Sequence, residues 1–105
     1  MSEFGRAAVA RANALGIMVD ISHASDNCMR DALAASKAPI IASHSSARAL
    51  VDHKRNIPDD LLRAIAAKGG VIQAVAYKEF VKHDPARAAA EKALQEQVAK
   101  QAGDV

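Results

Sequence analysis

Two histidines occupy equivalent places in this 105-residue sequence, each directly after a short apolar segment. His23 follows residues 17–22, and His44 follows residues 39–43. Such segments are typical of buried β-strands. In parallel α/β folds the carboxyl ends of the strands hold the active site, so we expect the two imidazoles to meet there. Two neutral imidazoles in that position are suited to binding a zinc ion.

Alternation along the strands predicts which way these side chains face. It places His23 on the face of Ile21 and His44 on the face of Ala42, so both could line the interior of a barrel. Asp20 then lies on the opposite face, towards a helix layer, where a buried carboxylate needs a partner and a structural role is expected. The alternative is that each histidine only forms hydrogen bonds at the end of a strand.

Other side chains carry weaker signals. The run from Ser43 to Ser46 includes His44, but neighbours in sequence are not a Ser–His pair in space, and no glycine elbow surrounds them. Ser45 and Ser46 are interpreted as caps of a short helix over residues 45–51, which includes Arg48. Solvated or packing roles are expected for four residues, Cys28, His53, Tyr77 and His83.

Arg55 lies in the polar loop that follows His44. Its planar guanidinium could hold a substrate carboxylate through two parallel hydrogen bonds. The alternative is that Arg55, like most arginines in loops, is solvated.

Composition excludes several classes of protein. The 14 Lys and Arg residues and 12 Asp and Glu residues give a net charge of +2 and are scattered, so no nucleic-acid partner is expected. The single cysteine excludes an internal disulfide framework and a four-thiolate zinc site. No apolar run is long enough to span a bilayer, and no signal peptide is recognisable, so the localisation is unknown.

The hydrophobic pattern alternates between helices and strands. Helices are expected over residues 4–15, 26–36, 45–51, 58–68 and 85–101, and strands over residues 17–22, 39–43 and 71–76. Gly16 stands where a helix favours a left-handed residue just beyond its end. The short connections predict an α/β fold with parallel strands and right-handed crossovers. An eight-stranded barrel needs about 250 residues, so we expect this chain to be part of a larger fold.

Three stretches together resemble the membrane (renal) dipeptidase family of zinc peptidases. They are VDISHAS at residues 19–25, SKAPIIASHSS at residues 36–46 and KRNIPDDLL at residues 54–62. The spacing between the histidines, 44 − 23 = 21, agrees with the family's pattern. The resemblance covers roughly residues 3–80, and residues 84–101 look like a helical insertion of some bacterial members.

This resemblance implies a (β/α)8 barrel that hydrolyses dipeptides through water activated by a binuclear zinc centre. Residues 1–105 would form a partial metallopeptidase barrel domain with three consecutive β/α units. His23 and His44 match the two histidines that bind one zinc, and Arg55 matches the arginine that holds the carboxylate of the dipeptide. Tyr77 matches a tyrosine near the site, to which no role is assigned.

The family's other metal ligands and its catalytic aspartate have no counterpart in this sequence. No residue of the chain is therefore assigned a catalytic role, and the chain alone is expected to be inactive. Two alternatives stay open, namely a fragment of another metal-dependent amidohydrolase and a non-catalytic α/β domain that associates with itself or a partner through exposed sheet edges. The SHSS and RNxPDD motifs favour the dipeptidase over the other hydrolases.

Overall fold

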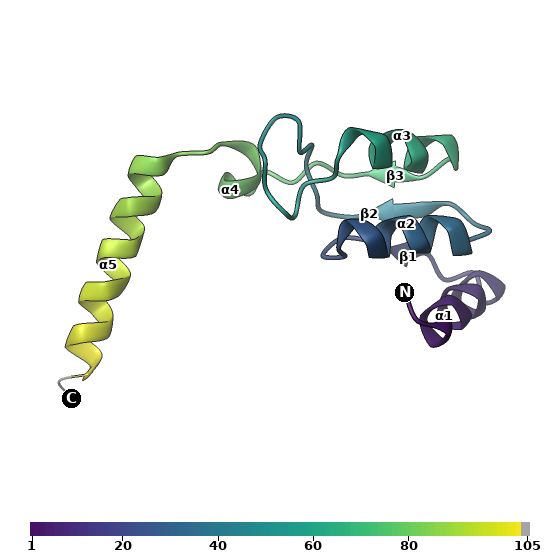
Figure 1. Ribbon diagram of the computed structural model, residues 1–105, viewed down its shortest axis with the longest axis horizontal. Helices are drawn as coiled ribbons and strands as arrows, with labels where there is room; N and C mark the ends of the chain where they lie inside the picture. Colours follow the sequence, from purple (N-terminus) through teal and green to yellow (C-terminus); the bar gives the residue numbers. More distant parts are fainter. Residues whose placement is uncertain (104–105) are drawn as a thin grey trace.

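The computed structural model describes residues 1–103, which form a mixed α/β structure with a small parallel sheet (Figure 1). The helices are α1 (Glu3–Ala14), α2 (Asp26–Ala35), α3 (Asp59–Ala67), α4 (Lys78–Val81) and α5 (Pro85–Gly103), and the strands are β1 (Val19–Asp20), β2 (Ile40–Ala42) and β3 (Val71–Ile72). The strands lie in the order β1-β2-β3, and both pairs are parallel, as the alternating pattern predicts.

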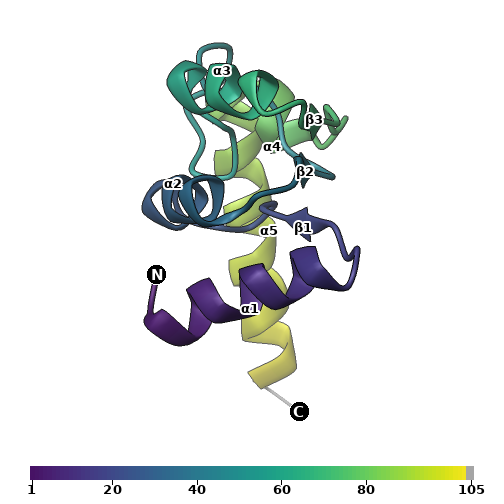
Figure 2. The same ribbon diagram turned by 90° about the vertical axis from the view of Figure 1, so that its right-hand side faces the viewer.

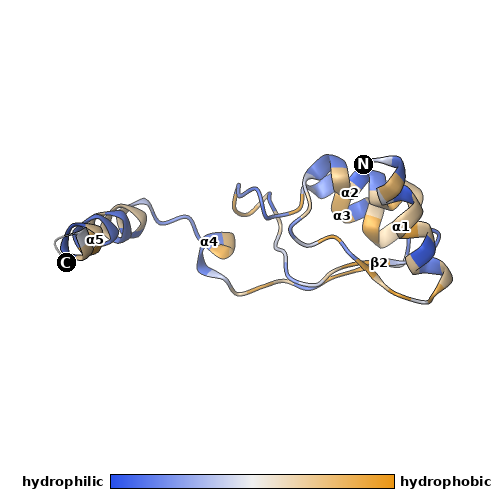
Figure 3. Ribbon diagram, turned by 90° about the horizontal axis from the view of Figure 1, so that it is seen from below, coloured by the Kyte–Doolittle hydropathy of each residue, from blue (hydrophilic) through white to orange (hydrophobic). Residues whose placement is uncertain are grey.

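Helices α1, α2 and α3 form one layer and the three strands form the other (Figure 2). Seen from below, these helices lie on the same side of the sheet (Figure 3). Among the described residues, no helix covers the opposite face, which we call the bare face. It carries Asp20, Ile41 and Val71, which are register partners across the sheet.

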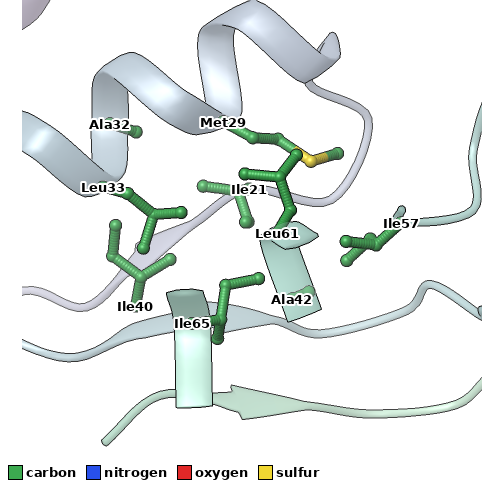
Figure 4. Close-up of a cluster of buried hydrophobic side chains, with 9 residues drawn as sticks. All are labelled: Ile21, Met29, Ala32, Leu33, Ile40, Ala42, Ile57, Leu61 and Ile65. Carbon is green, nitrogen blue, oxygen red and sulfur yellow. The ribbon is translucent and has the colours of Figure 1, made fainter. Parts of the chain in front are cut away.

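The hydrophobic core lies between the sheet and helices α2 and α3 (Figure 4). Its buried members are Ile21, Met29, Ala32, Leu33, Ile40, Ala42, Ile57, Leu61 and Ile65. Fully burying one of the larger aliphatic side chains contributes about 1.5–3 kcal/mol to the stability of the fold.

Ile21 and Ala42 belong to this core and pack against the helices. The prediction that their face lines a barrel interior was therefore wrong. Apolar helix side chains cover that face, which leaves polar Asp20 on the other.

Short-range features explain where the helices begin and end. The Oγ of Ser25 accepts a hydrogen bond from the N–H of Cys28 at 3.3 Å and caps α2. Gly16 has a φ of 72° just beyond α1, in agreement with its expected left-handed role. At Gly70 a Cβ atom would lie 2.4 Å from the carbonyl oxygen of Ile40, so only glycine allows the chain after α3 to pass this close to β2.

The segment from residue 45 to residue 51 is not a helix, so the prediction of a short helix capped by Ser45 and Ser46 was wrong. The N–H of Ile57 donates to the carbonyl of Ser46 at 2.8 Å, and the N–H of Arg48 donates to the carbonyl of Ile57 at 3.0 Å. These bonds come from a distant part of the loop, and the local bonds form only one turn, in which the N–H groups of Leu50 and Val51 donate to the carbonyl of Ala47.

The C-terminal part of the chain projects from the two layers (Figure 1). Helix α5 buries none of its side chains, and the molecule measures 54 × 32 × 20 Å. The sequence did not predict α4, a helix of four residues that buries Phe80. Within residues 1–103, no helix combines the length and the apolar character that a membrane span requires.

Candidate active site

The two histidines meet beyond the carboxyl ends of β1 and β2. Their Nε2 atoms lie 2.8 Å apart, and the ring centroids are 4.9 Å apart with the planes inclined at 62°. His23 has a φ of 73°, in the left-handed region. This turn ends the strand alternation, so His23 need not face the same way as Ile21. The structure therefore brings together the pair that the sequence singled out.

Asp20 links the ends of both strands through a set of hydrogen bonds. Its Oδ1 accepts from the N–H of Ser22 at 2.9 Å and from the N–H of Ser43 at 3.2 Å, and its Oδ2 accepts from the hydroxyl of Ser43. The expectation that Asp20 points towards the helices was wrong, because the core fills that face. Its partners were not predicted, since alternation within one strand says nothing about bonds to the next.

The same network reaches His44. The Oγ of Ser43 lies 2.8 Å from Nδ1 of His44, and the N–H of His44 donates to the Oγ of Ser22 at 3.0 Å. A continuous path therefore runs from the Asp20 carboxylate through Ser43 and His44 to His23. Hydrogen bonds to a ring nitrogen fix the orientation of an imidazole, so the path holds His44 towards His23.

The electrostatics of this cluster favour a charged aspartate and a neutral histidine. Desolvation raises the pKa of Asp20, but hydrogen bonds from Ser43 and Ser22 together outweigh it and place the pKa below its usual value. The pKa of His23 lies below its usual value, first because of desolvation and then because of the positive charge of Arg55. His23 is therefore neutral at pH 7, the form that binds metals.

Arg55 lies in the loop between β2 and α3, with its guanidinium carbon 5.3 Å from the centre of the Phe80 ring. Its positive charge is one of the causes that lower the pKa of His23. Nε and Nη2 of Arg55 are buried and have no hydrogen-bond partner within residues 1–103. These donors therefore suit an anionic ligand.

Hydrogen bonds made by Arg48 and Asn56, which the sequence did not predict, hold the loop that carries Arg55 in place. Arg48 donates two hydrogen bonds to the carboxylate of Asp26, at 2.6 and 2.7 Å, and its Nε donates to the carbonyl of Asn56 at 3.0 Å. The buried Nδ2 of Asn56 donates to the carbonyls of Val51 and Phe80, each at 2.9 Å. The only sign of these hydrogen bonds in the sequence was the position of Asn56 directly after Arg55.

The remaining candidate residues lie outside the histidine pair. His53 packs its ring against Phe80 with the centroids 4.7 Å apart, and Tyr77 does so at 4.9 Å. Cys28 is a partly buried free thiol on α2, and His83 is exposed between α4 and α5. A pocket of about 240 Å³ beside α4 and α5 is lined by His53 and His83 but does not include the histidine pair. The pocket is therefore separate from the candidate site.

Comparison with known proteins gives consistent results. The chain is 45% identical over 82 residues to an uncharacterised dipeptidase of Schizosaccharomyces pombe, which covers 78% of this chain and 20% of that protein. The probable dipeptidase PvdM from Pseudomonas aeruginosa superimposes with a TM-score of 0.74 at 45% identity, over 76% of this chain and 20% of PvdM. The chain thus spans about a fifth of the length of these relatives.

A metallopeptidase from Rhodobacter sphaeroides, solved with a phosphinate mimic of the dipeptide L-Ala-D-Ala, has a TM-score of 0.68 at 37% identity. The superposition covers 70% of this chain and 21% of that protein. The family model for membrane dipeptidases, peptidase family M19, matches residues 1–101. This match includes both histidines, Arg55 and most of α5, and it covers nearly the whole chain. The chain therefore belongs to the membrane dipeptidase family.

Proposed function

We propose that this chain supplies three consecutive β/α units of a (β/α)8 barrel and part of the active site of a zinc-dependent dipeptidase. The observation that carries the proposal is the convergence of His23 and His44 beyond two neighbouring parallel strands. In this proposal residues 3–80 carry the barrel units, and residues 84–101 form a helical insertion. The bare face of the sheet would then line the barrel interior.

The histidine pair fits a metal ion. Two nitrogens that bind one tetrahedral zinc at about 2.0–2.1 Å lie about 3.3 Å apart. The Nε2 atoms are 2.8 Å apart, so a small separation of the rings would admit the ion between them. A bound zinc ion would activate water for attack on the peptide bond. His23 and His44 would hold one ion of a binuclear centre, and the other ligands would lie outside this chain.

Arg55 is proposed to bind the C-terminal carboxylate of the dipeptide. Its buried donors, Nε and Nη2, have no acceptor within residues 1–103, which is costly unless a ligand supplies one. A carboxylate presents two oxygens at the spacing that a guanidinium matches. The phosphinate dipeptide mimic bound to the Rhodobacter sphaeroides neighbour supports a dipeptide as the substrate.

The chain by itself is proposed to be inactive. Within residues 1–103, no group of three or more histidine, cysteine or acidic side chains is placed to hold a metal ion. Two imidazoles lack the carboxylates that complete a hydrolytic metal site. The uncovered strands β1 and β3 are also proposed to promote self-association, because outer strands expose unpaired backbone groups.

Zinc titration of the 105-residue chain at neutral pH tests the metal assignment. The chain should bind zinc weakly, and His23→Ala and His44→Ala should each abolish that binding. His83→Ala is the matched control, because His83 is exposed and distant in sequence from both strands, and it should bind as the parent does. Equal binding by the parent and both single variants would overturn the assignment.

A dipeptide hydrolysis assay tests the expected inactivity. The chain with added zinc should release no more free amino acid than the His23→Ala chain. Zinc-dependent release above that control would show that the chain is catalytically complete.

A further inference from the structure

The hydrogen bonds that join Asp20, Ser43 and His44 determine which of their atoms carry protons. An aspartate carboxylate at neutral pH only accepts hydrogen bonds. The hydroxyl of Ser43 contacts Oδ2 of Asp20, so its single proton must lie in that contact. Ser43 then has no proton left to donate to a second partner.

The same hydroxyl oxygen lies 2.8 Å from Nδ1 of His44. Because Ser43 can only accept in this contact, Nδ1 of His44 must carry the proton. A neutral imidazole has one N–H group, so Nε2 of His44 carries a lone pair instead. That lone pair faces Nε2 of His23, 2.8 Å away, which requires His23 to be protonated on Nε2 in the metal-free chain.

We infer that Asp20 and Ser43 are positioning residues that hold His44 as the Nδ1–H tautomer and keep its Nε2 lone pair available for the metal. The metal part of this inference rests on the proposed function. Partners on the second nitrogen commonly orient metal-binding histidines and raise the basicity of the ligand. In this chain the partner is a serine that is itself oriented by a carboxylate.

The sheet fixes the position of this relay. Oδ1 of Asp20 accepts from the backbone N–H groups of Ser22 and Ser43, which lie just beyond β1 and β2. The carboxylate therefore cannot swing away without losing two bonds to neighbouring strand ends. Ser22 adds a further link by accepting from the N–H of His44 at 3.0 Å. The relay thus couples the strand pairing to the direction of the His44 ring.

Ring-nitrogen NMR of the metal-free, ¹⁵N-histidine-labelled chain tests the proton assignment. His44 should give a protonated Nδ1 and an unprotonated Nε2, and His23 should give a protonated Nε2. A wild-type His44 protonated on Nε2 would overturn the relay. These spectra need no metal, so they decide the relay even if zinc titration overturns the proposed function.

Two variants test which residues set the tautomer. In Asp20→Asn the amide can donate to Ser43, which frees the serine proton to donate to Nδ1 and favours the Nε2–H tautomer. The same isosteric change at the orienting aspartate of serine proteases traps histidine in the wrong tautomer. Ser43→Ala removes the acceptor and should shift His44 the same way. If both variants are folded and His44 remains protonated on Nδ1, the inference is wrong.

Ser46→Ala is the matched control for these variants. The hydroxyl of Ser46 donates to the carbonyl of Val75 at 3.2 Å, away from the relay, so the tautomer of His44 should not change. Ser43→Thr keeps a hydroxyl and should retain the Nδ1–H form, which gives a second test if Ser43→Ala fails to fold.

Competition with a chromophoric chelator measures the consequence for zinc. Asp20→Asn should weaken zinc binding about 10- to 100-fold, the usual effect of losing a partner that orients a ligand. Ser46→Ala should bind as the parent does. Equal zinc affinity for the parent and Asp20→Asn would show that the relay does not support metal binding.

Discussion

Arg55 places two charged donors in a buried position without an acceptor from residues 1–103. Leaving a buried charged donor unpaired costs about 1–3 kcal/mol or more. The ring of Phe80 beneath the guanidinium offsets part of this cost through a cation–π contact. In the proposed function the rest is recovered when the carboxylate of the substrate binds, so Arg55 is proposed to serve recognition rather than stability.

Replacing Arg55 by lysine should therefore weaken catalysis in the complete protein. A lysine ammonium cannot form the planar pair of bonds, so kcat/KM for a dipeptide should fall by about 2–4 kcal/mol of transition-state stabilisation. Zinc content should not change, since no hydrogen bond joins Arg55 to His23 or His44 within residues 1–103. Arg63→Lys on the exposed side of α3 is the control, and an unchanged kcat/KM for Arg55→Lys would remove Arg55 from the site.

Asn56 stabilises the fold, because it is fully buried and its side-chain amide donates to two backbone carbonyls. Asn56→Ala should leave the carbonyl of Phe80 unpaired and remove one of the two hydrogen bonds to the carbonyl of Val51, which also accepts from the N–H of His53. We expect this change to destabilise the chain by about 2–3 kcal/mol. Urea unfolding measures this loss. Asn27→Ala, at an exposed position of α2, should have little effect, and equal stabilities for the two variants would contradict the structural role of Asn56.

The sequence predicted part of the geometry of the candidate site. His23 and His44 were identified because each follows an apolar strand, and this placement needs no knowledge of side-chain direction. The role of Asp20 was missed because strand alternation was extended to His23, whereas the backbone turns at His23 with a φ of 73°. The buried state of Arg55 depends on Phe80, which is 25 residues further along (80 − 55 = 25), beyond the range of local patterns.

At the scale of elements, local signals predicted α1, α2 and α3 closely. The serine cap at Ser25 and the glycine stops after α1 and α3 brought α1, α2 and α3 to within one residue of the expected bounds at each end. Strands were predicted too long, because an apolar run such as residues 71–76 says nothing about how many residues find a partner. Only Val71–Ile72 of that run is a strand.

The ion pair between Asp26 and Arg48 joins the start of α2 to the loop that carries Arg55. Hydrogen bonds from Arg48 hold the pKa of Asp26 below its usual value of 3.8. The unfolded chain therefore takes up the proton first as the pH falls. The pair contributes to stability above about pH 3.8, and this contribution is lost as the pH falls through the lower pKa of the folded chain.

Asp26→Asn should accordingly be less stable than the parent at neutral pH, and the difference should shrink in acid. Urea midpoints at neutral pH and at the lowest pH where the parent stays folded would measure it. Glu96→Gln, the same kind of change on exposed α5, should track the parent at both pH values. A difference that stays constant with pH would show that the Asp26 charge is not responsible.

At the scale of the whole molecule, one side of the sheet has no covering layer within residues 1–103 (Figure 3). Val71 on the bare face is 54% exposed, and β1 and β3 are outer strands. Exposed apolar surface beside an unpaired strand favours association. The same surface would be covered inside a complete barrel.

Sedimentation velocity of the isolated chain should therefore show oligomers. Val71→Lys places a charge on the bare face and should shift the population towards monomer. Leu94→Lys adds the same charge on α5, where Leu94 is 60% exposed, and should leave association unchanged. A monodisperse parent monomer with a cooperative thermal transition would instead indicate a self-standing domain.

Because α5 buries no side chain, its 19 residues hold their shape almost as an isolated peptide does, with a modest balance between helix and coil. Lys78 of α4 pairs with Glu91 and so links α4 to the first turns of α5, while Arg87 pairs with the same carboxylate from within α5. Deuterium should consequently enter the amides of α5 in a gradient, slowest near Glu91 and fastest near Gln101. Glu91→Gln should flatten that gradient while leaving the amides of β2 protected, and a uniform slow rate along α5 would mean that it melts together with the core.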